Sequence, residues 1–384
     1  MCLFESIIAF FASLRQYAWE ILYGAMPMYS MMNNPVSTVS GMEKDWRIIL
    51  NDHLQTAKKP LIVILGPTAS GKTAFSVEVA RAIGEKNQMM QRKQKMKRND
   101  VIESPDLERH LSSDSSTSSV SSHSSVEIIN ADSRQFYRHL TIGTAKITPE
   151  EMQGIPHHLI DVLDPKAPVT IAWYQKEAAT IIDDVLARGT IPMLVGGSML
   201  YISSIIDGLQ PPVASDPDLR KRLEEEYEHD GGVSLHAKLA DLDPESAQLI
   251  PKQNRVYLIR ALEIIERSGK KASAQKQTSS CPYDLLIFGM DMPPELLNER
   301  INRRMEAMFD AGWIDEVRDL LKRGYTIEDP GMESHGYREI AAALQSGHFD
   351  QGSLIKDIAA KTRQYAKRQR TWWRGDRRIH WIKT

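Results

Sequence analysis

Leu61-Ile-Val-Ile-Leu65 and Gly66-Pro-Thr-Ala-Ser-Gly-Lys-Thr73 adjoin each other in this 384-residue chain. The apolar run predicts a buried strand, and the glycine-rich run predicts a phosphate-binding loop that opens a helix over residues 74–83. Gly66 and Gly71 let the backbone turn its amides toward an anion, and the helix N-terminus adds partial positive charge. Lys72 can reach the terminal phosphates, and the Thr73 hydroxyl can hold Mg²⁺. The loop predicts a diphosphate or triphosphate ligand without deciding between them.

Composition narrows the class of protein. The formal net charge is −2, so overall charge argues neither for nor against nucleic-acid binding. Cys2 and Cys281 are the only cysteines, which excludes a disulfide framework and a four-thiolate zinc site. This cysteine usage fits a reducing compartment, so we expect a cytoplasmic protein, with an organelle as the alternative.

Residues 1–58 are expected to form an N-terminal extension outside the main fold. The apolar run Ile7-Ile-Ala-Phe-Phe-Ala12 is too short to span a bilayer, and charged residues flank it. The segment lacks the Arg-rich, acid-poor composition of a transit peptide and has no clear cleavage site. We therefore expect no membrane partner, and a targeting or membrane-surface role is the less favoured alternative.

Residues 86–125 differ in composition from the rest of the core. Residues 86–98 are rich in Lys, Arg and Gln, and residues 111–125 are dominated by serine. Such a segment buries too little apolar surface to offset chain entropy. We predict a disordered surface insertion and consider a nucleic-acid-binding tail less favoured.

Strands alternate with helices through most of the chain. We predict strands at 126–131, 158–163, 191–195 and 283–291, an edge strand at 378–382, and helices at 171–187, 294–308, 314–323 and 353–373. The alternation predicts an α/β fold with a parallel sheet, whose core spans residues 59–210 and continues in residues 283–384. Ligands gather at the carboxyl ends of parallel strands. Residues 66–73, Asp132, residues 158–161 and residues 196–198 should therefore converge.

Residues 211–282 break this alternation. Their pattern is helical and charged, with predicted helices at 218–227, 233–239 and 254–267 and no buried strand. We predict a helical insertion domain.

Asp132 follows the second core strand and is the main candidate for chemistry. From the residues alone, three roles stay open. The carboxylate can complete a Mg²⁺ site, act as a general base, or cap the following turn.

Other candidates compete with structural roles. His157 and His158 are predicted to be packed, hydrogen-bonded histidines rather than metal ligands. Gly196-Gly197 predicts a close approach of the backbone to a ligand or to another element. Arg300 and Arg304, four residues apart on one helix face, form either a solvated basic face or a clamp for diphosphate.

The C-terminal run Thr362-Arg-Gln-Tyr-Ala-Lys-Arg-Gln-Arg-Thr-Trp-Trp-Arg374 interleaves cations with aromatic rings. Residues 361–378 contain eight Lys or Arg residues and one acid, Asp376. This composition suits contacts with an RNA backbone and stacking on exposed bases. The alternative is a helix that packs its aromatic stripe into the core.

Further motifs lie between Pro60 and about Trp381, apart from the serine-rich insertion. They are Asp132-Ser-Arg-Gln-Phe-Tyr137, Ile142-Gly-Thr-Ala-Lys146, Ile155-Pro-His-His-Leu-Ile-Asp161, Gly196-Gly-Ser-Met-Leu-Tyr201, Arg260-Ala-Leu-Glu263, Gly336-Tyr-Arg-Glu339 and Thr362-Arg-Gln-Tyr-Ala-Lys-Arg-Gln-Arg-Thr-Trp372. With the phosphate loop, they resemble the tRNA dimethylallyltransferases, the isopentenyl-diphosphate:tRNA transferases that prenylate an adenosine beside the anticodon. A kinase that shares only the loop would not reproduce the other motifs.

The resemblance implies a P-loop NTPase-like fold and a prenyl transfer. The dimethylallyl group of dimethylallyl diphosphate would go to the exocyclic N6 amine of the adenosine 3′-adjacent to the anticodon, with release of diphosphate. By the same likeness Asp132 matches the general base, Arg304 matches the arginine on the diphosphate, and Thr73 lies near the diphosphate and its Mg²⁺. The helical insertion corresponds to the domain that grips the anticodon stem-loop, and we expect a monomer.

Binding residues also follow from the resemblance. The diphosphate would be held by Gly66, Pro67, Thr68, Ala69, Ser70, Gly71, Lys72 and Thr73. Positions that match tRNA contacts are Asp132, Ser133, Arg134, Gln135, Ser198, Arg220, Val256, Tyr257, Leu258, Ile259 and Arg260.

Three residues depart from the family pattern: Ser198 replaces a common Thr, Tyr257 replaces a common Arg, and His335 replaces a common aliphatic residue. The alternative functions are prenylation of free adenine nucleotides and, less favoured, a small-molecule kinase. A non-catalytic RNA-binding protein would leave the retention of Lys72, Thr73 and Asp132 together unexplained.

Overall fold

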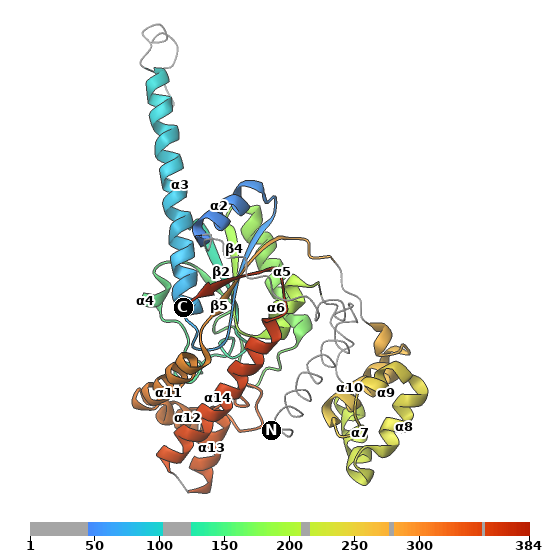
Figure 1. Ribbon diagram of the computed structural model, residues 1–384. Coiled ribbons are helices and arrows are strands. Elements are labelled where there is room, and N and C mark those ends of the chain that lie inside the picture. The colour runs from blue at the N-terminus through green and yellow to red at the C-terminus, as the bar shows by residue number, and fades with distance from the viewer. Residues whose placement is uncertain (1–44, 103–123, 209–215, 276–279, 348–349) are drawn as a thin grey trace. The chain divides into compact units, whose positions relative to one another are not determined.

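The computed structural model describes residues 45–102, 124–208, 216–275, 280–347 and 350–384 (Figure 1). The chain divides into two compact units. An α/β unit comprises residues within Lys44–Ile202 and Pro282–Thr384, and a helical unit comprises Ser203–Cys281. Within the part that the structure describes, no helix combines the length and the apolar character required to cross a lipid bilayer.

The α/β unit is built on one parallel sheet. Its strands are β1 (Pro60–Leu65), β2 (Val126–Ala131), β3 (His157–His158), β4 (Ile191–Gly196), β5 (Asp284–Asp291) and β6 (Ile379–Lys383). They lie in the order β3-β2-β4-β1-β5-β6, and every pairing is parallel. The register places Leu65 beside Gly196 and Gly289, so β1, β4 and β5 reach the carboxyl edge together. The predicted α/β class with a parallel sheet is confirmed.

Strand β3 is shorter than the predicted strand at 158–163. Leu159 and Asp161 adopt left-handed backbone conformations, with φ of 59° and 55°. Because such angles are incompatible with an extended strand, the ladder ends at His158. Pairing resumes only as an isolated bridge between Tyr137 and Leu163.

Helices cover the sheet because its inner strands are apolar on both faces. From α3 (Lys72–Ile102), Phe75, Val79 and Ile83 pack against one face, where they meet Ile62 and Ile64. From α5 (Ile171–Ala187), a buried stripe that includes Tyr174 and Ile182 contacts β2 and β4. The bounds of α5 match the prediction, because the Thr170 side chain caps its first turn and Gly189 follows its end.

Helix α2 (Trp46–Thr56) corrects the predicted extent of the N-terminal extension. Leu50 is buried in the same core as α3, and the ring of Trp46 meets Phe75 edge-on with 5.4 Å between ring centroids. Residues 46–56 are therefore part of the α/β unit, and the prediction that they lie outside it is wrong. Residues 1–44, including the apolar run at 7–12, lie outside the described residues.

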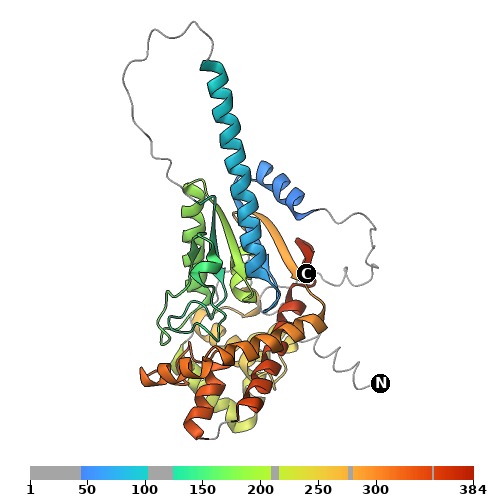
Figure 2. The ribbon, with the colours of Figure 1, turned by 90° about the vertical axis from the view of Figure 1, so that its left-hand side faces the viewer.

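Helix α3 also continues beyond its predicted end. Residues 86–102, which we call the α3 extension, remain helical and project past the sheet in both views (Figures 1 and 2). The prediction of disorder is wrong for this part, because Lys, Arg, Gln and Met have high helix propensity and a packed helix already precedes them. Residues 103–123, with most of the serine-rich tract, lie outside the described residues.

A second core in the α/β unit lies among its C-terminal helices. It is formed by α11 (Pro294–Asp310), α12 (Trp313–Lys322), α13 (Tyr337–Ser346) and α14 (Gln351–Trp373). Trp313 packs between Gly143 and Gly336, which explains two of the sequence motifs as packing motifs. Glu316 accepts hydrogen bonds from the amides of Thr141 and Ile142, so α12 holds the loop that follows β2. Helix α13 was not predicted.

Two short helices lie in the connections between strands. They are α4 (Pro149–Met152), which begins with a capping box, and α6 (Met199–Ile206), which follows β4.

The helical unit has its own core. Its elements are α7 (Pro217–Asp230), α8 (Val233–Leu242), α9 (Pro244–Leu249), α10 (Arg255–Ser268) and a short 3₁₀ turn, η2 (Ser273–Gln275). Leu223, Leu235, Leu239, Leu258 and Leu262 are buried together at its centre. The six-residue helix α9 is too short for a periodic signal and was not predicted.

Candidate active site

A cavity of about 590 Å³ lies at the carboxyl edge of the sheet. Its walls come from the phosphate loop, the ends of β2 and β4, the loop around Thr144, and α11. The strand ends and the phosphate loop converge here as the parallel sheet predicts, and every lining residue belongs to the α/β unit.

The phosphate loop is shaped to hold an anion. Gly71 has a φ of 89°, a conformation that residues with a side chain rarely adopt. The Lys72 ammonium donates to the Pro67 carbonyl at 2.7 Å. Burial lowers the pKa of Lys72 to about 8, although the Asp132 carboxylate acts in the opposite direction. Ser70 Oγ is fully buried and has no partner among the described residues. An unpaired buried hydroxyl in a phosphate loop is compatible with a site that binds a polar ligand.

Two arginines of α11 complete this side of the cavity. The Arg304 guanidinium donates to the Thr68 hydroxyl, and its buried Nε has no partner among the described residues. Burial lowers the pKa of Arg304 from its usual value, and the Asp132 carboxylate opposes that shift. Arg300 also lines the cavity and lies beside Gly71. Lys72, Arg300 and Arg304 thus surround the loop with positive charge, which favours the clamp interpretation of the arginine pair.

Asp132 lies at the end of β2 in the wall of the same cavity. Its carboxylate accepts a hydrogen bond from the Arg134 amide at 3.0 Å, so the predicted cap of the following turn is present. The remaining carboxylate oxygen is not used by that bond. Because Asp132 interacts electrostatically with both Lys72 and Arg304, the carboxylate and the cations share one site. A general-base role and a role near a metal both remain compatible with this position.

Thr73 is the residue that the sequence predicts as a ligand for Mg²⁺. Its side chain is exposed at the first turn of α3 and lines the cavity. Among the described residues, no cluster of three His, Cys, Asp or Glu residues could enclose a metal ion. Mg²⁺ commonly takes one or two protein oxygens and completes its shell with substrate phosphates and water. The Thr73 hydroxyl beside a bound diphosphate fits that requirement.

Comparisons with known proteins decide the family. A family profile described as IPP transferase matches residues 135–376. A tRNA dimethylallyltransferase from Symbiobacterium thermophilum is 39% identical over 328 residues, which cover 85% of this chain and 89% of the relative. This chain belongs to the IPP transferase family.

Solved structures agree with this assignment. The full-length tRNA isopentenylpyrophosphate transferase from Bacillus halodurans matches with a TM-score of 0.55 and 33% identity, over 85% of this chain and 90% of that chain. A eukaryotic dimethylallyltransferase, described as acting on tRNA, shares the fold with a TM-score of 0.64 at 24% identity, over 85% of this chain and 74% of that chain. The fold of this IPP transferase is therefore that of its family.

In this IPP transferase, helix α14 holds the phosphate loop through a side-chain hydrogen bond. The Gln369 side chain accepts from the Thr68 amide at 2.9 Å and donates to the Gly197 carbonyl at 2.7 Å. A Cβ on Gly197 would come within 2.4 Å of Gln369 Nε2, so the glycine pair allows close approach of another element. Sequence reasoning missed Gln369. The sequence feature that could have identified Gln369 is its position: it is a polar residue at the helical spacing of the buried residues of α14.

Several basic residues of α14 and of the residues after it are exposed. Thr362, Ala366, Gln369 and Trp373 form its buried stripe, whereas Lys367, Arg368 and Arg374 are exposed. Of the aromatic residues in this run, Trp373 thus packs into the core, whereas Tyr365 and Trp372 are partly exposed, and the same helix still presents cations to solvent.

The histidines that precede the Asp161 turn are hydrogen-bonded, as predicted. His157 Nδ1 bonds the Ile155 carbonyl at 2.8 Å, and His158 Nε2 bonds Glu127 Oε2 at 2.7 Å. The Arg188 guanidinium also bonds Glu127 and, with His158, lowers the pKa of Glu127 to about 2. His157 additionally lines the cavity.

The predicted RNA-contacting residues of the α/β unit lie at or near the cavity. Asp132 and Gln135 line it, and the Ser133 amide donates to Ser198 Oγ at 3.0 Å. One nitrogen of Arg134 donates to the Pro330 carbonyl at 3.2 Å. These bonds hold the segment in one conformation beside the cavity.

The predicted RNA-contacting residues of the helical unit have mixed environments. Arg220 and Arg260 both pair with the buried Glu263 carboxylate. Val256 is 74% exposed, whereas Leu258 and Ile259 are buried in the core of the unit, which leaves their side chains no surface for RNA. Tyr257 is half-buried, and burial raises its pKa.

Proposed function

We propose that this chain transfers a dimethylallyl group from dimethylallyl diphosphate to the exocyclic N6 amine of the adenosine 3′-adjacent to the anticodon of tRNA and releases diphosphate. The observation that supports this proposal most strongly is that the cationic phosphate loop and the Asp132 carboxylate line the same cavity. The relatives, which are named tRNA dimethylallyltransferases at 35–42% identity, support the same transfer.

On the donor side, the loop would bind the diphosphate. The backbone amides around Gly71, the Lys72 ammonium and the Arg304 guanidinium are placed to stabilise charge that grows on the leaving diphosphate. The Thr73 hydroxyl, together with diphosphate oxygens, would hold Mg²⁺. When bound, Mg²⁺ would neutralise part of the diphosphate charge.

On the acceptor side, Asp132 would act on the amine. The amine nitrogen forms a bond to the first allyl carbon as the carbon–oxygen bond to diphosphate breaks, and the electron pair leaves with the diphosphate. Asp132 accepts the proton that the amine loses. The adenine must first leave the stack of its loop to reach the cavity, as other base-modifying enzymes require.

The tRNA partner needs a surface wider than the cavity. The exposed cations of α14 and the folded helical unit supply surface that a free nucleotide would not use. We include in the proposal that the helical unit holds the anticodon stem-loop. We also propose that a monomer suffices, because one chain supplies the phosphate loop, Arg304 and Asp132 that the transfer requires.

The test is a transfer assay with competing acceptors. The purified protein would be incubated with dimethylallyl diphosphate, Mg²⁺ and unmodified tRNA, with AMP and ATP in parallel, and the digested RNA would be searched for prenylated adenosine by mass spectrometry. Prenylated tRNA with unmodified nucleotides is expected. Prenylated AMP would assign the protein to nucleotide prenylation. No transfer to either acceptor would reject the proposal and direct attention to ATP turnover by a kinase.

A further inference from the structure

The turn that presents Asp132, residues 132–137, is attached at its start by Asn130. The Asn130 carboxamide accepts from the Asp132 amide at 2.9 Å and donates to the Asp132 carbonyl at 3.1 Å. The same carboxamide donates to the Leu159 carbonyl at 2.9 Å. Asn130 is 5% exposed, so it links the candidate base to the segment after β3 from inside the protein.

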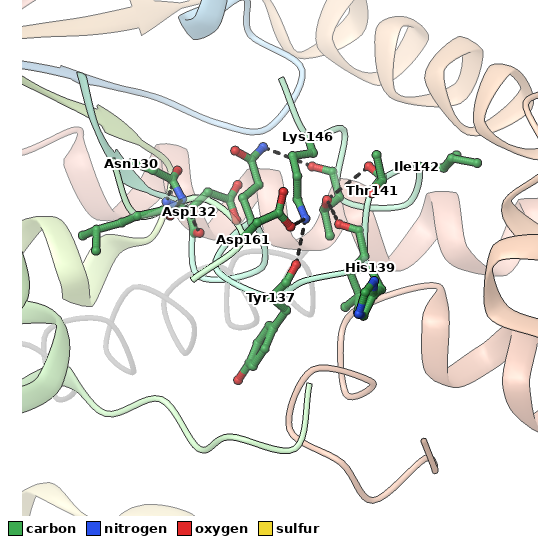
Figure 3. A network of polar contacts seen from close by, with 12 residues as sticks. Asn130, Asp132, Tyr137, His139, Thr141, Ile142, Lys146 and Asp161 are labelled. Atoms are coloured by element: carbon green, nitrogen blue, oxygen red, sulfur yellow. Dashed lines mark hydrogen bonds and ion pairs between the residues drawn. The ribbon is translucent and has the colours of Figure 1, made fainter. Parts of the chain in front are cut away.

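The end of the same turn is attached by Lys146. The Lys146 ammonium donates to the Tyr137 carbonyl at 2.7 Å and forms an ion pair with the Asp161 carboxylate at 2.5 Å (Figure 3). The Lys146 side chain is 4% exposed, whereas that of Asp161 is 49% exposed. A buried ammonium is costly without acceptors, so these two bonds determine where Lys146 can lie.

Both attachments use one short segment, Leu159–Asp161. Leu159 and Asp161 have left-handed backbones, and so does Ala145, which precedes Lys146 and has a φ of 47°. Residues with a side chain hold such angles only where surrounding contacts require them, and these angles cluster at functional sites. Here the contacts include those of Asn130 and Lys146, together with the hydrogen bond that the Asp161 amide donates to the Gln135 carbonyl at 3.1 Å.

Lys146 itself is not part of the cavity wall, but its neighbours are. Thr144, Ala145 and Gln135 line the cavity, and the Gln135 carboxamide donates to the carbonyls of Thr144 and Ala145 at 3.2 Å. The loop that carries Lys146 and the turn that carries Asp132 therefore form one part of the cavity wall, and the phosphate loop forms another.

We propose that Lys146, paired with Asp161, is a positioning residue that holds this wall so that the Asp132 carboxylate faces the attacking amine. This inference rests on the proposed prenyl transfer. Lys146 touches neither substrate: it acts through the Tyr137 carbonyl, the Asp161 carboxylate and the turn between Asp132 and Tyr137. Neither of the two bonds of the Lys146 ammonium goes to the donor half of the site, which is built from the phosphate loop and α11.

The test uses Lys146→Met, which keeps the length of the side chain and removes its charge. The half-exposed Asp161 carboxylate can then be hydrated, so the fold should survive. Misplacement of a catalytic group by about 1 Å can cost about a hundredfold in rate, so we expect kcat at saturating tRNA to fall by roughly tenfold to a hundredfold. KM for dimethylallyl diphosphate should stay within about twofold, because the donor half is untouched.

Two further variants sharpen the result. Lys166→Met makes the same chemical change at an exposed lysine of the following loop and should leave kcat unchanged. Asp161→Asn keeps an oxygen acceptor but removes the charge, and should give a smaller loss than Lys146→Met. This milder variant also decides the matter if Lys146→Met does not fold.

A double-mutant comparison separates positioning from general structural support. If Lys146 acts through Asp132, adding Lys146→Met to Asp132→Ala should lower the residual single-turnover rate by less than about threefold. Independent, multiplicative losses would overturn the inference, as would an unchanged kcat or a parallel loss of dimethylallyl diphosphate affinity. Wild-type protein is measured beside the variants: if it prenylates no tRNA, the proposed function fails and the inference fails with it.

Discussion

At Lys72, burial and charge act in opposite directions. Burial favours the neutral amine and lowers the pKa to about 8, Asp132 favours the ammonium, and Arg304 disfavours it. A bound diphosphate would add negative charge beside the amine and so favour the ammonium. Binding and protonation of Lys72 are therefore linked.

This linkage predicts the pH dependence of donor binding. Below pH 8 the free protein already carries the Lys72 ammonium, but above pH 8 a proton must be taken up on binding. The affinity for dimethylallyl diphosphate, measured by calorimetry without tRNA, should therefore weaken above pH 8 by up to about tenfold per pH unit. Lys72→Met should bind more weakly at pH 7 and show little of this dependence. An unchanged pH dependence in that variant would assign the effect to another group.

Replacement of Asp132 should affect tRNA binding and prenyl transfer to different extents. The Asp132 carboxylate lines the cavity, while the Asn130 side-chain carboxamide, bonded to the Asp132 backbone, holds the turn. Asp132→Ala should lower single-turnover prenylation by about a hundredfold or more, because the amine loses its proton acceptor. The dissociation constant for tRNA, measured by filter binding, should change by only a fewfold. Equal losses of binding and turnover would contradict the base role.

Among the elements, α2 shows how a short helix becomes part of a core. Trp46, Ile49, Leu50 and Leu54 recur at the spacing of one helix face, and they pack beside Phe75 of α3. The same helix leaves Ile48 half-exposed on another face.

The packing of α2 predicts unequal effects of two matched substitutions. Leu50→Ala should lower the free energy of unfolding by about 2–4 kcal/mol, because it opens a cavity between α2 and α3. Ile48→Ala truncates a half-exposed side chain and should change the free energy of unfolding by no more than about 0.5 kcal/mol. Urea denaturation measures both. Similar effects for the two variants would mean that α2 does not pack as described.

Comparison of elements also shows what sequence can predict. The bounds of α5 were predictable because a capping Thr, an apolar stripe and a following Gly coincide. The end of α3 was not predicted correctly. The low apolar content of residues 86–102 was interpreted as disorder, although Lys, Arg, Gln and Met favour a helix. The end of β3 was not predictable either, because the left-handed residues Leu159 and Asp161 are held by contacts with residues distant in sequence, among them Asn130 and Lys146.

At the scale of the whole molecule, the sheet explains why motifs spread over the chain meet. Parallel strands place the phosphate loop, Asp132 and the β4 end at one edge, and this convergence followed from the alternation of elements alone. The contribution of α14 could not be predicted in this way, because the Gln369 side chain bonds the Thr68 amide, which is 301 residues away in the sequence. Side-chain contacts of that range depend on how helices pack, which no local pattern encodes.

The α3 extension and the residues after it lie outside this convergence. Among the residues of α3 whose side chains the structure describes, Ile83 is the last deeply buried one, and the Lys86 ammonium donates a hydrogen bond to the Asn51 side chain. Because α3 begins at the carboxyl edge of the sheet, the extension projects from the opposite edge, away from the cavity (Figure 2). It carries six Lys or Arg residues and no acid between residues 86 and 98. The charge leaves a choice between a tolerated insertion and an RNA-binding arm.

Replacing residues 90–122 with a flexible Gly/Ser linker distinguishes these possibilities. If the segment is a tolerated insertion, the melting temperature should change by no more than about 2 °C, because those of its side chains that the structure describes, Arg92 and Lys93, are exposed. Prenylation of tRNA and its dissociation constant should stay within about twofold. An RNA-binding arm would instead weaken tRNA binding at low salt and flatten its dependence on salt, because fewer phosphates would be neutralised. Arg92→Gln with Lys93→Gln in the full chain, both exposed, serves as the matched control that removes charge without changing loop length.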